Sequence, residues 1–247
     1  MTPQPKPAFP IPILARRVID TLADHRLELA KRAVVPVVAY VVLLRLEFSD
    51  IVSDRHETAI EIVVVVAFLL VVLHFVLCWQ RLLQAGPAAA GHPFGFWMGP
   101  QEWRLTGHAM MFTVFWFVIE FAVYLAEGWM GAVVGWIAWG AGSLLFYGFL
   151  SRHLLMFPMT AVDEEAKFGG SWDLTRPAWG PYVSFLAIFG VPMGAIVWIA
   201  APYLGPDPIG LELSLVVQGL ATYLAVAVMA TVLAVVYTEL RPKTPGD

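Results

Sequence analysis

Six stretches of this chain are long and apolar enough to cross a membrane, and this feature limits the fold more than any other. A hydrocarbon core of about 30 Å requires about 20 mainly apolar residues in a helix. The stretches cover residues 33–52, 59–79, 107–126, 129–150, 181–203 and 213–237. Only 14% of the residues are charged, against about 25% in soluble domains. The sequence therefore predicts an all-α polytopic membrane protein with six transmembrane helices in a domain over residues 33–240.

A different pattern precedes the first apolar stretch. The proline-rich start is followed by charged residues rather than by a signal-peptide core with a cleavage site, so we expect a retained tail. From residue 11 to residue 32, apolar and charged positions fall on opposite sides of a helix, formed by Leu14, Val18, Leu22 and Leu29 and by Arg17, Asp20, Asp24, Glu28 and Lys31. This indicates an amphipathic interfacial helix, with Glu28 and Arg32 placed for an i,i+4 pair. The predicted divisions are thus residues 1–32, the domain over 33–240, and a tail over 241–247.

The distribution of lysine and arginine predicts the orientation of the helices. Cytoplasmic loops of membrane proteins are enriched in these residues. Two of the 15 lie toward one face, Arg45 and Arg55. The other thirteen lie toward the opposite face: Lys6, Arg16, Arg17, Arg26, Lys31, Arg32, Arg81, Arg104, Arg152, Lys167, Arg176, Arg241 and Lys243. We therefore expect both termini in the cytoplasm and a location in the bacterial inner membrane.

A W-x-L-T motif occurs twice, each time before a long apolar stretch. At shifts of 69 and 71 residues the second copy matches the first, pairing Arg81, Pro87, Trp103 and Thr106 with Arg152, Pro158, Trp172 and Thr175. We interpret each copy as a helix that leaves the membrane at an arginine, is ended by a proline, and returns through an interfacial segment. This predicts an internal repeat of helices 2–3 and 4–5 in parallel orientation. Such repeats occur in transporters, but a duplicated packing unit is the favoured interpretation.

Local signals around the two motifs predict where short helices begin and end. In the second copy Ser171 is placed to cap a short interfacial helix, which Pro177 would break before the fifth transmembrane helix. In the first copy Pro100, Gln101 and Glu102 form an equivalent start. Both motifs are therefore expected to form separate short helices at the membrane surface.

The segment around the second motif resembles a known group of membrane proteins. In "RHLLMFPMTAVDEEAKFGGSWDLTRPAWGPYVSF" the arginine, proline, acid and Trp-x-x-Thr-Arg of the pattern are Arg152, Pro158, Asp163, Trp172, Thr175 and Arg176. The segment is similar to the YciC-like bacterial proteins and to the membrane domains of some glycerophosphodiester phosphodiesterases, although Pro177 stands where a glycine is usual. The resemblance covers about residues 60 to 190. It implies a six-helix fold and an inner-membrane location, and it implies little about activity.

Catalytic and cofactor-binding motifs are missing from the sequence. There is no phosphate-binding glycine loop, zinc-binding His-Glu-x-x-His or Gly-x-Ser-x-Gly turn, and a net charge of −4 does not favour nucleic acid as a partner. The single cysteine, Cys78, excludes a disulfide within the chain. His74, His108 and His153 could ligate a haem, but polar packing is the favoured role. We expect no enzyme activity, no metal and no cofactor.

The expected partners are the lipid bilayer and another membrane protein or complex. Gly131 and Gly135 form a small-xxx-small pair, which allows close approach of two helices. Packing within one chain is favoured over a homodimer through this face. The leading hypothesis is a non-enzymatic integral membrane protein that binds or organises protein complexes or lipids.

The alternative function is a small transporter for a proton, a cation or a lipid-like solute. Arg45, Glu61 and Glu120 lie within apolar stretches at one shared depth, about a turn below the outer surface. Isolated charges in a bilayer are costly, so these residues should face inward and pair. One cation with two carboxylates leaves negative charge that a bound proton or cation would relieve. A purely structural pair of Arg45 with Glu61 is favoured over a transport site.

Overall fold

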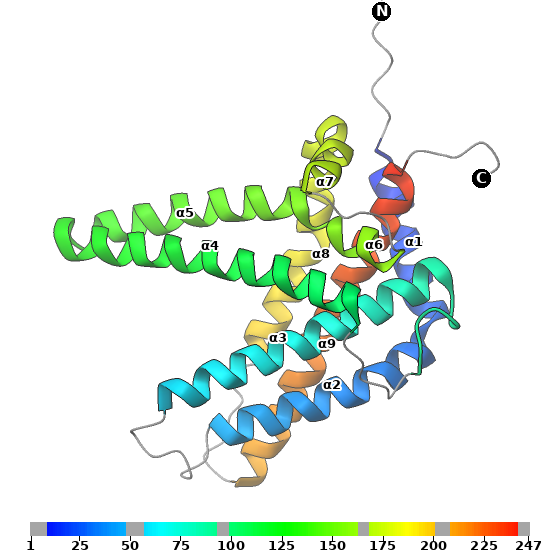
Figure 1. Ribbon diagram of the computed structural model, residues 1–247, viewed down its shortest axis with the longest axis horizontal. Coiled ribbons are helices and arrows are strands. Elements are labelled where there is room, and N and C mark those ends of the chain that lie inside the picture. The colour runs from blue at the N-terminus through cyan, green and yellow to red at the C-terminus, as the bar shows by residue number, and fades with distance from the viewer. Residues whose placement is uncertain (1–8, 48–56, 93–98, 163–167, 201–207, 242–247) are drawn as a thin grey trace, which may run out of the picture.

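The computed structural model describes residues 9–47, 57–92, 99–162, 168–200 and 208–241. Helices are the only regular secondary structure in these segments (Figure 1). They are α1 Ile11–Asp24, α2 Arg26–Glu47, α3 Glu57–Ala85, α4 Pro100–Met130, α5 Ala132–His153, α6 Met156–Ala161, α7 Phe168–Thr175, the 3-10 helix η1 Arg176–Ala178, α8 Trp179–Ala200 and α9 Pro208–Leu240. The all-α prediction is therefore confirmed for the described part of the chain.

Five helical segments of the described residues are long and apolar enough to span a membrane, where the sequence predicted six. They are Val63–Ala85, Pro100–Met130, Val133–Ala161, Gly169–Ile199 and Glu212–Leu240. The first predicted stretch, 33–52, is not among them. Its described part belongs to α2, which has Lys31 and Arg32 near one end and Arg45 and Glu47 near the other, and residues 48–52 lie outside the described residues.

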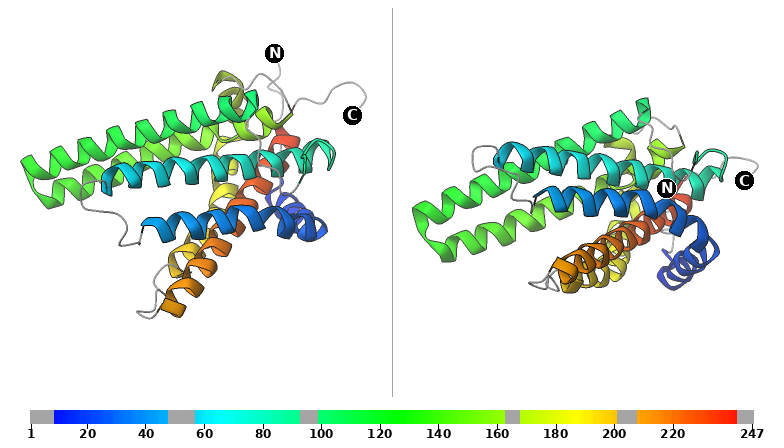
Figure 2. Two further views of the ribbon diagram at one scale, coloured as in Figure 1. Left: turned by 60° about the horizontal axis from the view of Figure 1, so that its bottom comes forward. Right: turned by 90° about the horizontal axis from the view of Figure 1, so that it is seen from below.

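The helices form three pairs that meet at one end of the molecule and diverge toward the other (Figures 1 and 2). α2 lies beside α3, α4 beside α5, and α8 beside α9. The short helices α1, α6 and α7 lie near the end where the pairs meet, and the α4–α5 hairpin extends away from the other two pairs (Figure 2). The two larger hydrophobic cores lie between these helices. One is formed by α1, α8 and α9, and the other by α2, α3 and α9.

α9 is the central helix of both cores. Of the 18 residues that form its most apolar stretch, 61% are buried inside the protein, against 11% for the corresponding stretches of α4 and of the segment that begins with α5. Its small residues let neighbours approach closely: a Cβ at Gly219 would lie 3.1 Å from the Tyr40 ring of α2. Buried Trp79 of α3 donates a hydrogen bond of 2.9 Å to the Thr231 hydroxyl of α9. Polar and small groups of α9 therefore hold α2 and α3 in place.

The N-terminal arm differs from the expectation in two ways. Its helix ends at Asp24, and a second helix, α2, runs on past residue 32, so the predicted division at 32/33 falls inside α2. The side chains of Leu14 and Val18, expected to enter the lipid, are instead fully buried against α8 and α9. The physical reason is that these two helices offer an apolar surface that matches the stripe, which makes burial in lipid unnecessary. The predicted Glu28–Arg32 pair is confirmed, with 3.7 Å between Oε2 and Nε.

The two W-x-L-T motifs adopt different local structures. α4 begins at Pro100 as predicted, but it continues through Trp103 to Met130, because no proline follows the first motif. The second motif lies in the short helix α7, which ends at Thr175. The following 3-10 helix η1 contains Pro177, which was predicted to break the helix. The expectation of two separate short helices is therefore wrong for the first copy.

Two further details of the repeat differ from the expectation. Ser171 lies inside α7 rather than at its N-cap, and its hydroxyl donates to the carbonyl oxygen of Arg152 at 2.5 Å. Pro87 follows the end of α3, as expected, but Pro158 lies in the first turn of α6 and does not end α5. The first turn of a helix tolerates proline because its N–H groups have no partner within the helix.

Candidate functional site

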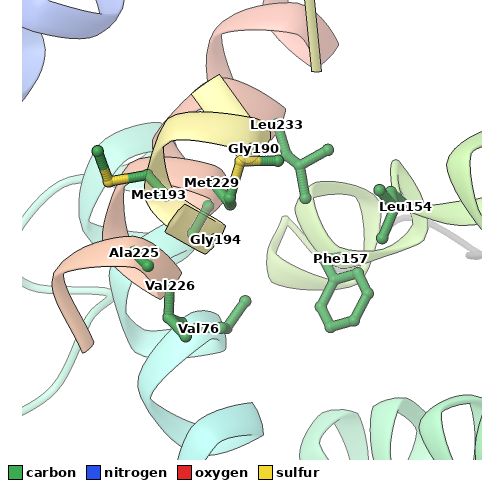
Figure 3. A pocket seen from close by; sticks show the side chains of 11 residues that line it. Val76, Leu154, Phe157, Gly190, Met193, Gly194, Ala225, Val226, Met229 and Leu233 are labelled. Atoms are coloured by element: carbon green, nitrogen blue, oxygen red, sulfur yellow. The ribbon is translucent and has the colours of Figure 1, made fainter. Parts of the chain in front are cut away.

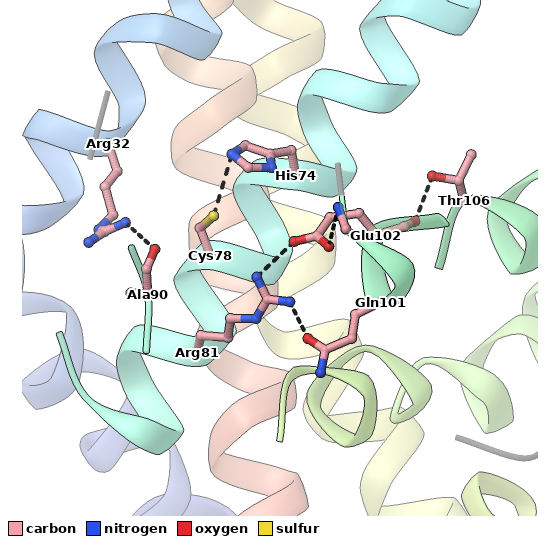
Figure 4. Close-up of polar contacts among 9 residues, drawn as sticks. Arg32, His74, Cys78, Arg81, Ala90, Gln101, Glu102 and Thr106 are labelled. Atoms are coloured by element: carbon pink, nitrogen blue, oxygen red, sulfur yellow. Dashed lines mark hydrogen bonds and ion pairs between the residues drawn. The ribbon is translucent and has the colours of Figure 1, made fainter. Parts of the chain in front are cut away.

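Arg81, near the C-terminal end of α3, is held by two side chains from the first turn of α4. Its Nη1 donates to Glu102 Oε1 at 2.7 Å, and its Nη2 donates to Gln101 Oε1 (Figure 4). Glu102 is buried and also accepts the N–H of Gly99 at 3.0 Å. Charge-assisted bonds of this kind are stronger than neutral ones. This contact therefore neutralises the Arg81 charge within the protein and joins α3 to α4.

Arg32 of α2 forms a second polar contact at the same end of the molecule. Its Nη1 donates to the carbonyl oxygen of Ala90 at 3.1 Å (Figure 4). Its Nη2 donates to that of Gly91 at 2.9 Å. Gly91 has φ +67°, a conformation that favours glycine. Glu28 faces Arg32 at the start of α2, and a hydrogen bond from Lys31 holds the pKa of Glu28 below its ordinary value. These contacts join α2 to the turn that follows α3.

Arg152, the sequence equivalent of Arg81, has a different environment at the end of α5. Its guanidinium carbon lies 4.2 Å from the ring centroid of Trp172 in α7 and 4.7 Å from that of Trp179 at the start of α8. Each tryptophan contributes a cation–π contact, which is stronger where water is excluded. Among the residues that the structure describes, no carboxylate forms an ion pair with Arg152. The two equivalent arginines therefore differ in how their charge is balanced.

An apolar pocket of about 280 Å³ lies between α3, α6, α8 and α9. Its lining is almost entirely carbon and sulfur, and includes Val76, Phe157, Gly190, Gly194, Met229 and Leu233 (Figure 3). A Cβ added at Gly194 would meet nothing within 4 Å, so this glycine leaves open space. The composition of the lining suits a hydrocarbon chain.

The predicted charge cluster is only partly described. Arg45 forms an ion pair with Glu212 at the start of α9, with 3.2 Å between Nε and Oε1. The side chain of Glu61 lies outside the described residues, so its pairing with Arg45 stays a prediction. Glu212 was not identified from the sequence as a partner of Arg45. Its place at the start of the last apolar stretch puts it on the same predicted side of the membrane as Arg45.

Glu120 lines a separate cavity between α4 and α5. The cavity has a volume of about 420 Å³ and is also lined by Glu127, Trp136 and Trp139. In the described part of the chain Glu120 has no ion pair. Its position in this hairpin places it on a different helix pair from Arg45 and Glu212.

The three histidines lie among other side chains of the helices. His74 Nε2 lies 3.5 Å from the Cys78 sulfur, and the His153 ring lies 4.4 Å from that of Phe149 and 5.9 Å from that of Trp172. His108 is on α4, one turn after Arg104. Within the described residues, no group of three histidine, cysteine or acidic side chains could hold a metal ion.

The glycine pair predicted as a packing face lies in the α4–α5 hairpin. Gly131 forms the turn between the helices with φ +88°. A Cβ at Gly135 would lie 2.9 Å from Glu127 Cβ, so this glycine permits the close approach of α4. Gly135 therefore has a packing role within the chain, whereas a homodimer through this face stays a prediction.

Comparisons with protein-family models, with curated proteins and with solved structures find no match to this chain.

Proposed function

We propose that this protein is a six-span, non-enzymatic protein of the bacterial inner membrane that binds or organises other membrane components. The observation that supports this function best is the exposure of the α4–α5 hairpin. In the most apolar stretch of each of its two helical segments, only 11% of the residues are buried inside the protein, against 61% for α9. The exposed side chains include large aromatic residues such as Phe117, Phe121 and Trp136. Such a surface needs lipid or a partner protein to cover it.

The contacts of α2 support a sixth span. Arg32 bonds to the turn after α3, so α2 begins on the side of the membrane where α3 ends. α3 is long and apolar enough to span a membrane, so on this proposal its other end lies across the membrane and α2 crosses to reach it. The Arg45–Glu212 pair agrees, because it joins the end of α2 to the start of α9.

The side shared by the two ends of the described chain supports the proposed orientation. Arg17 of α1 forms an ion pair with Glu239 near the end of α9, with 3.5 Å between Nη1 and Oε2. An even number of spans places these two helix ends on one side. The excess of lysine and arginine on that side assigns it to the cytoplasm. The arm α1 then lies at the cytoplasmic surface against α8 and α9.

The threonines of the two motifs make the same local hydrogen bond, which is consistent with the proposed internal repeat but is also made by Thr113, Thr160, Thr231 and Thr238. Thr106 donates to the carbonyl oxygen of Glu102 at 2.8 Å, and Thr175 donates to that of Ser171 at 3.0 Å. The two tryptophans of the motifs are both exposed. We retain the repeat, and the similarity to YciC-like proteins that includes its second copy, as part of the proposal.

Site-specific cross-linking tests the proposed function. A photo-reactive residue at Phe121 or Leu144 of the hairpin should form a discrete protein adduct in intact membranes. Val191 of α8 and Leu213 of α9 are matched controls, because their side chains are exposed to a similar degree, 70% and 64%, against 62% and 77%. We expect only lipid adducts at the controls. Lipid adducts alone at all four positions would contradict a partner-binding role for the hairpin.

The transporter alternative is favoured by one observation, the Glu120 cavity. Two carboxylates and two tryptophans line it, and aromatic rings with carboxylates are a combination that suits cations. On this alternative, Glu120→Gln should abolish cation or proton flux in liposomes with the fold intact. Glu212→Gln is the control. It removes the acid of the Arg45–Glu212 ion pair and should leave flux unchanged.

A further inference from the structure

We propose that the protein holds one anionic phospholipid, with its phosphate on Arg152 and one acyl chain in the apolar pocket beside α8. The inference rests on the proposed membrane location and names a lipid class for the proposed binding function. It combines three features of the described residues: the Arg152 environment, the alignment of that environment with the pocket, and the open space at Gly194.

The first feature is the orientation of the Arg152 guanidinium. The guanidinium carbon lies 4.2 Å from the ring centroid of Trp172 and 4.7 Å from that of Trp179, and cation–π contacts of this kind do not use the N–H groups as hydrogen-bond donors. A guanidinium is a planar fork of donors that matches a phosphate bidentately. Its position in the last turn of α5 places it near the cytoplasmic surface on the proposed orientation. Headgroup phosphates lie at this level.

The comparison with Arg81 shows that the second copy lacks the acid that would occupy these donors. Arg81 is bound by Gln101 and Glu102. At the shift of 69 residues that aligns the W-x-L-T motifs, these positions become Gly170 and Ser171. Ser171 bonds to the backbone of Arg152 rather than to its guanidinium. Among the described residues, the second copy therefore has the same arginine without the carboxylate, which leaves a positive charge that suits an external anion.

The second feature is the alignment of this site with the pocket along α8. Gly190 is eleven residues after Trp179 in this helix. At about 100° per residue the two positions lie within about 20° of the same face, and at about 1.5 Å per residue they are about 16 Å apart. One leaflet of a hydrocarbon core is about 15 Å deep. A lipid whose phosphate lies at Trp179 can therefore extend a chain along this face into the pocket.

The third feature is the open space at Gly194, which belongs to the pocket. The pocket volume of about 280 Å³ is just below the range of about 300–1,000 Å³ for whole drug-sized ligands, which suits a single chain. Gly194 leaves open space, and the Met229 side chain lies 3.7 Å from a Cβ at Gly190. A Cβ at position 194 would meet no protein atom within 4 Å, so we expect a larger side chain there to compete with the ligand for this space.

Native mass spectrometry of the full chain in mild detergent tests the proposal, with phosphatidylglycerol, phosphatidylcholine and inorganic phosphate as probes. We expect one retained phosphatidylglycerol in preference to phosphatidylcholine. Arg152→Gln and Gly194→Leu should each weaken retention by about tenfold or more. Arg152→Lys should lie between, because an ammonium keeps the charge but lacks the fork. Thermal unfolding checks that each variant is folded.

Two matched controls and three contrary outcomes make the test decisive. Arg176→Gln removes an exposed arginine nearby, and Gly140→Leu places the same side chain at an α5 glycine with open space; both should retain lipid as the wild type does. Equal retention by Arg152→Gln and Arg176→Gln would overturn the site. Displacement of the lipid by inorganic phosphate would identify free phosphate as the ligand and contradict the chain in the pocket. Lipid retained only after Asp163, Glu164 and Glu165 are neutralised would show that the chain's own acids occupy Arg152.

The result is separable from the proposed partner-binding function. Arg152→Gln leaves the α4–α5 hairpin surface unchanged, so cross-linking from Phe121 should persist in this variant. Loss of lipid with persistent cross-linking supports both proposals. Persistent lipid binding without any protein adduct would remove the partner-binding role and leave the lipid site standing.

Discussion

Arg81 and Arg152 occupy equivalent positions in the sequence, yet the structure gives them different partners. Arg81 is paired with a buried glutamate across two helices, whereas Arg152 makes cation–π contacts with two tryptophans. Loss of one partner of a partly buried ion pair is costly, because the other charge is left without compensation. The position that fixes this difference is residue 102 in one copy and residue 171 in the other. Glu102 accepts a hydrogen bond from the Arg81 guanidinium, whereas Ser171 bonds to the backbone of Arg152.

We predict that Glu102→Ala destabilises the protein by about 3 kcal/mol, because it leaves the Arg81 charge without its carboxylate and the Gly99 N–H without an acceptor. Asp20→Ala is the control: its pair with Arg16 is exposed on α1, and exposed pairs contribute about 0–1 kcal/mol. Chemical unfolding in detergent, followed by tryptophan fluorescence, measures both variants. Equal stability of the two would show that the Arg81–Glu102 contact is not maintained in solution.

Sequence periodicity predicted local pairs but not the contacts between distant helices. Glu28 and Arg32 were recognisable because a helix brings positions i and i+4 together. Arg45 with Glu212 and Arg81 with Glu102 depend on which helices are neighbours, and hydropathy contains no such information. Pro100 and Pro177 were recognisable for the same local reason, since proline restricts where a helix begins or breaks. The Ser171 bond to Arg152 was missed because an N-cap and an interhelical contact use the same hydroxyl.

At the scale of elements, α1 shows how an amphipathic pattern can be satisfied by protein instead of lipid. Its Leu14 and Val18 pack against α8 and α9, and its exposed face includes Ile13 and Ile19. The sequence alone predicts that a stripe is buried and does not say what buries it. In this fold the arm packs against the start of α8 and the end of α9, two helices that are far from it in sequence.

We predict that Leu14→Ala lowers stability by about 2–5 kcal/mol, as expected for a large-to-small change in a core. Ile13→Ala, at a neighbouring position that is 61% exposed where Leu14 is 0% exposed, should change stability by less than about 0.5 kcal/mol. The measurement is the same unfolding transition. A similar cost at both positions would indicate that α1 lies in the membrane surface, as the sequence first suggested.

The α4–α5 hairpin depends on a close approach at Gly135. A Cβ at this position would meet Glu127 Cβ at 2.9 Å and its Cα at 3.4 Å, so the α4 backbone itself would have to move. We predict that Gly135→Leu separates the two helices and lowers the thermal stability of the fold without changing the oligomeric mass. Gly140→Leu, at a position with open space, should leave stability nearly unchanged. A change of mass in Gly135→Leu alone would instead place this glycine in a homodimer contact.

At the scale of the whole molecule, apolar length predicted which segments are helical but not which of them form the core. The spanning windows of α4 and α9 have similar mean hydropathy, 1.9 and 2.2, yet 11% of one and 61% of the other are buried inside the protein. A membrane makes these two environments look alike in sequence, because lipid and protein interior are both apolar. The divergence of the helix pairs therefore had no signal in the sequence. The lipid and partner proposals both concern the surfaces that this divergence leaves uncovered.

The number and direction of spans can be tested on the whole molecule by labelling single cysteines. In a Cys78→Ala background, a membrane-impermeant maleimide added to intact cells should label Glu212→Cys, because its side chain is half-exposed at the proposed outer end of α9. Asp20→Cys on α1 and Arg241→Cys after α9 are both exposed, and each should be labelled only after the membrane is opened. The contact of Arg17 with Glu239 requires α1 and the end of α9 to lie on one side, and an odd number of spans would separate them. Labelling of Asp20→Cys but not Arg241→Cys in intact cells would therefore overturn the sixth span, whereas labelling of both with protection of Glu212→Cys would reverse the orientation and keep six.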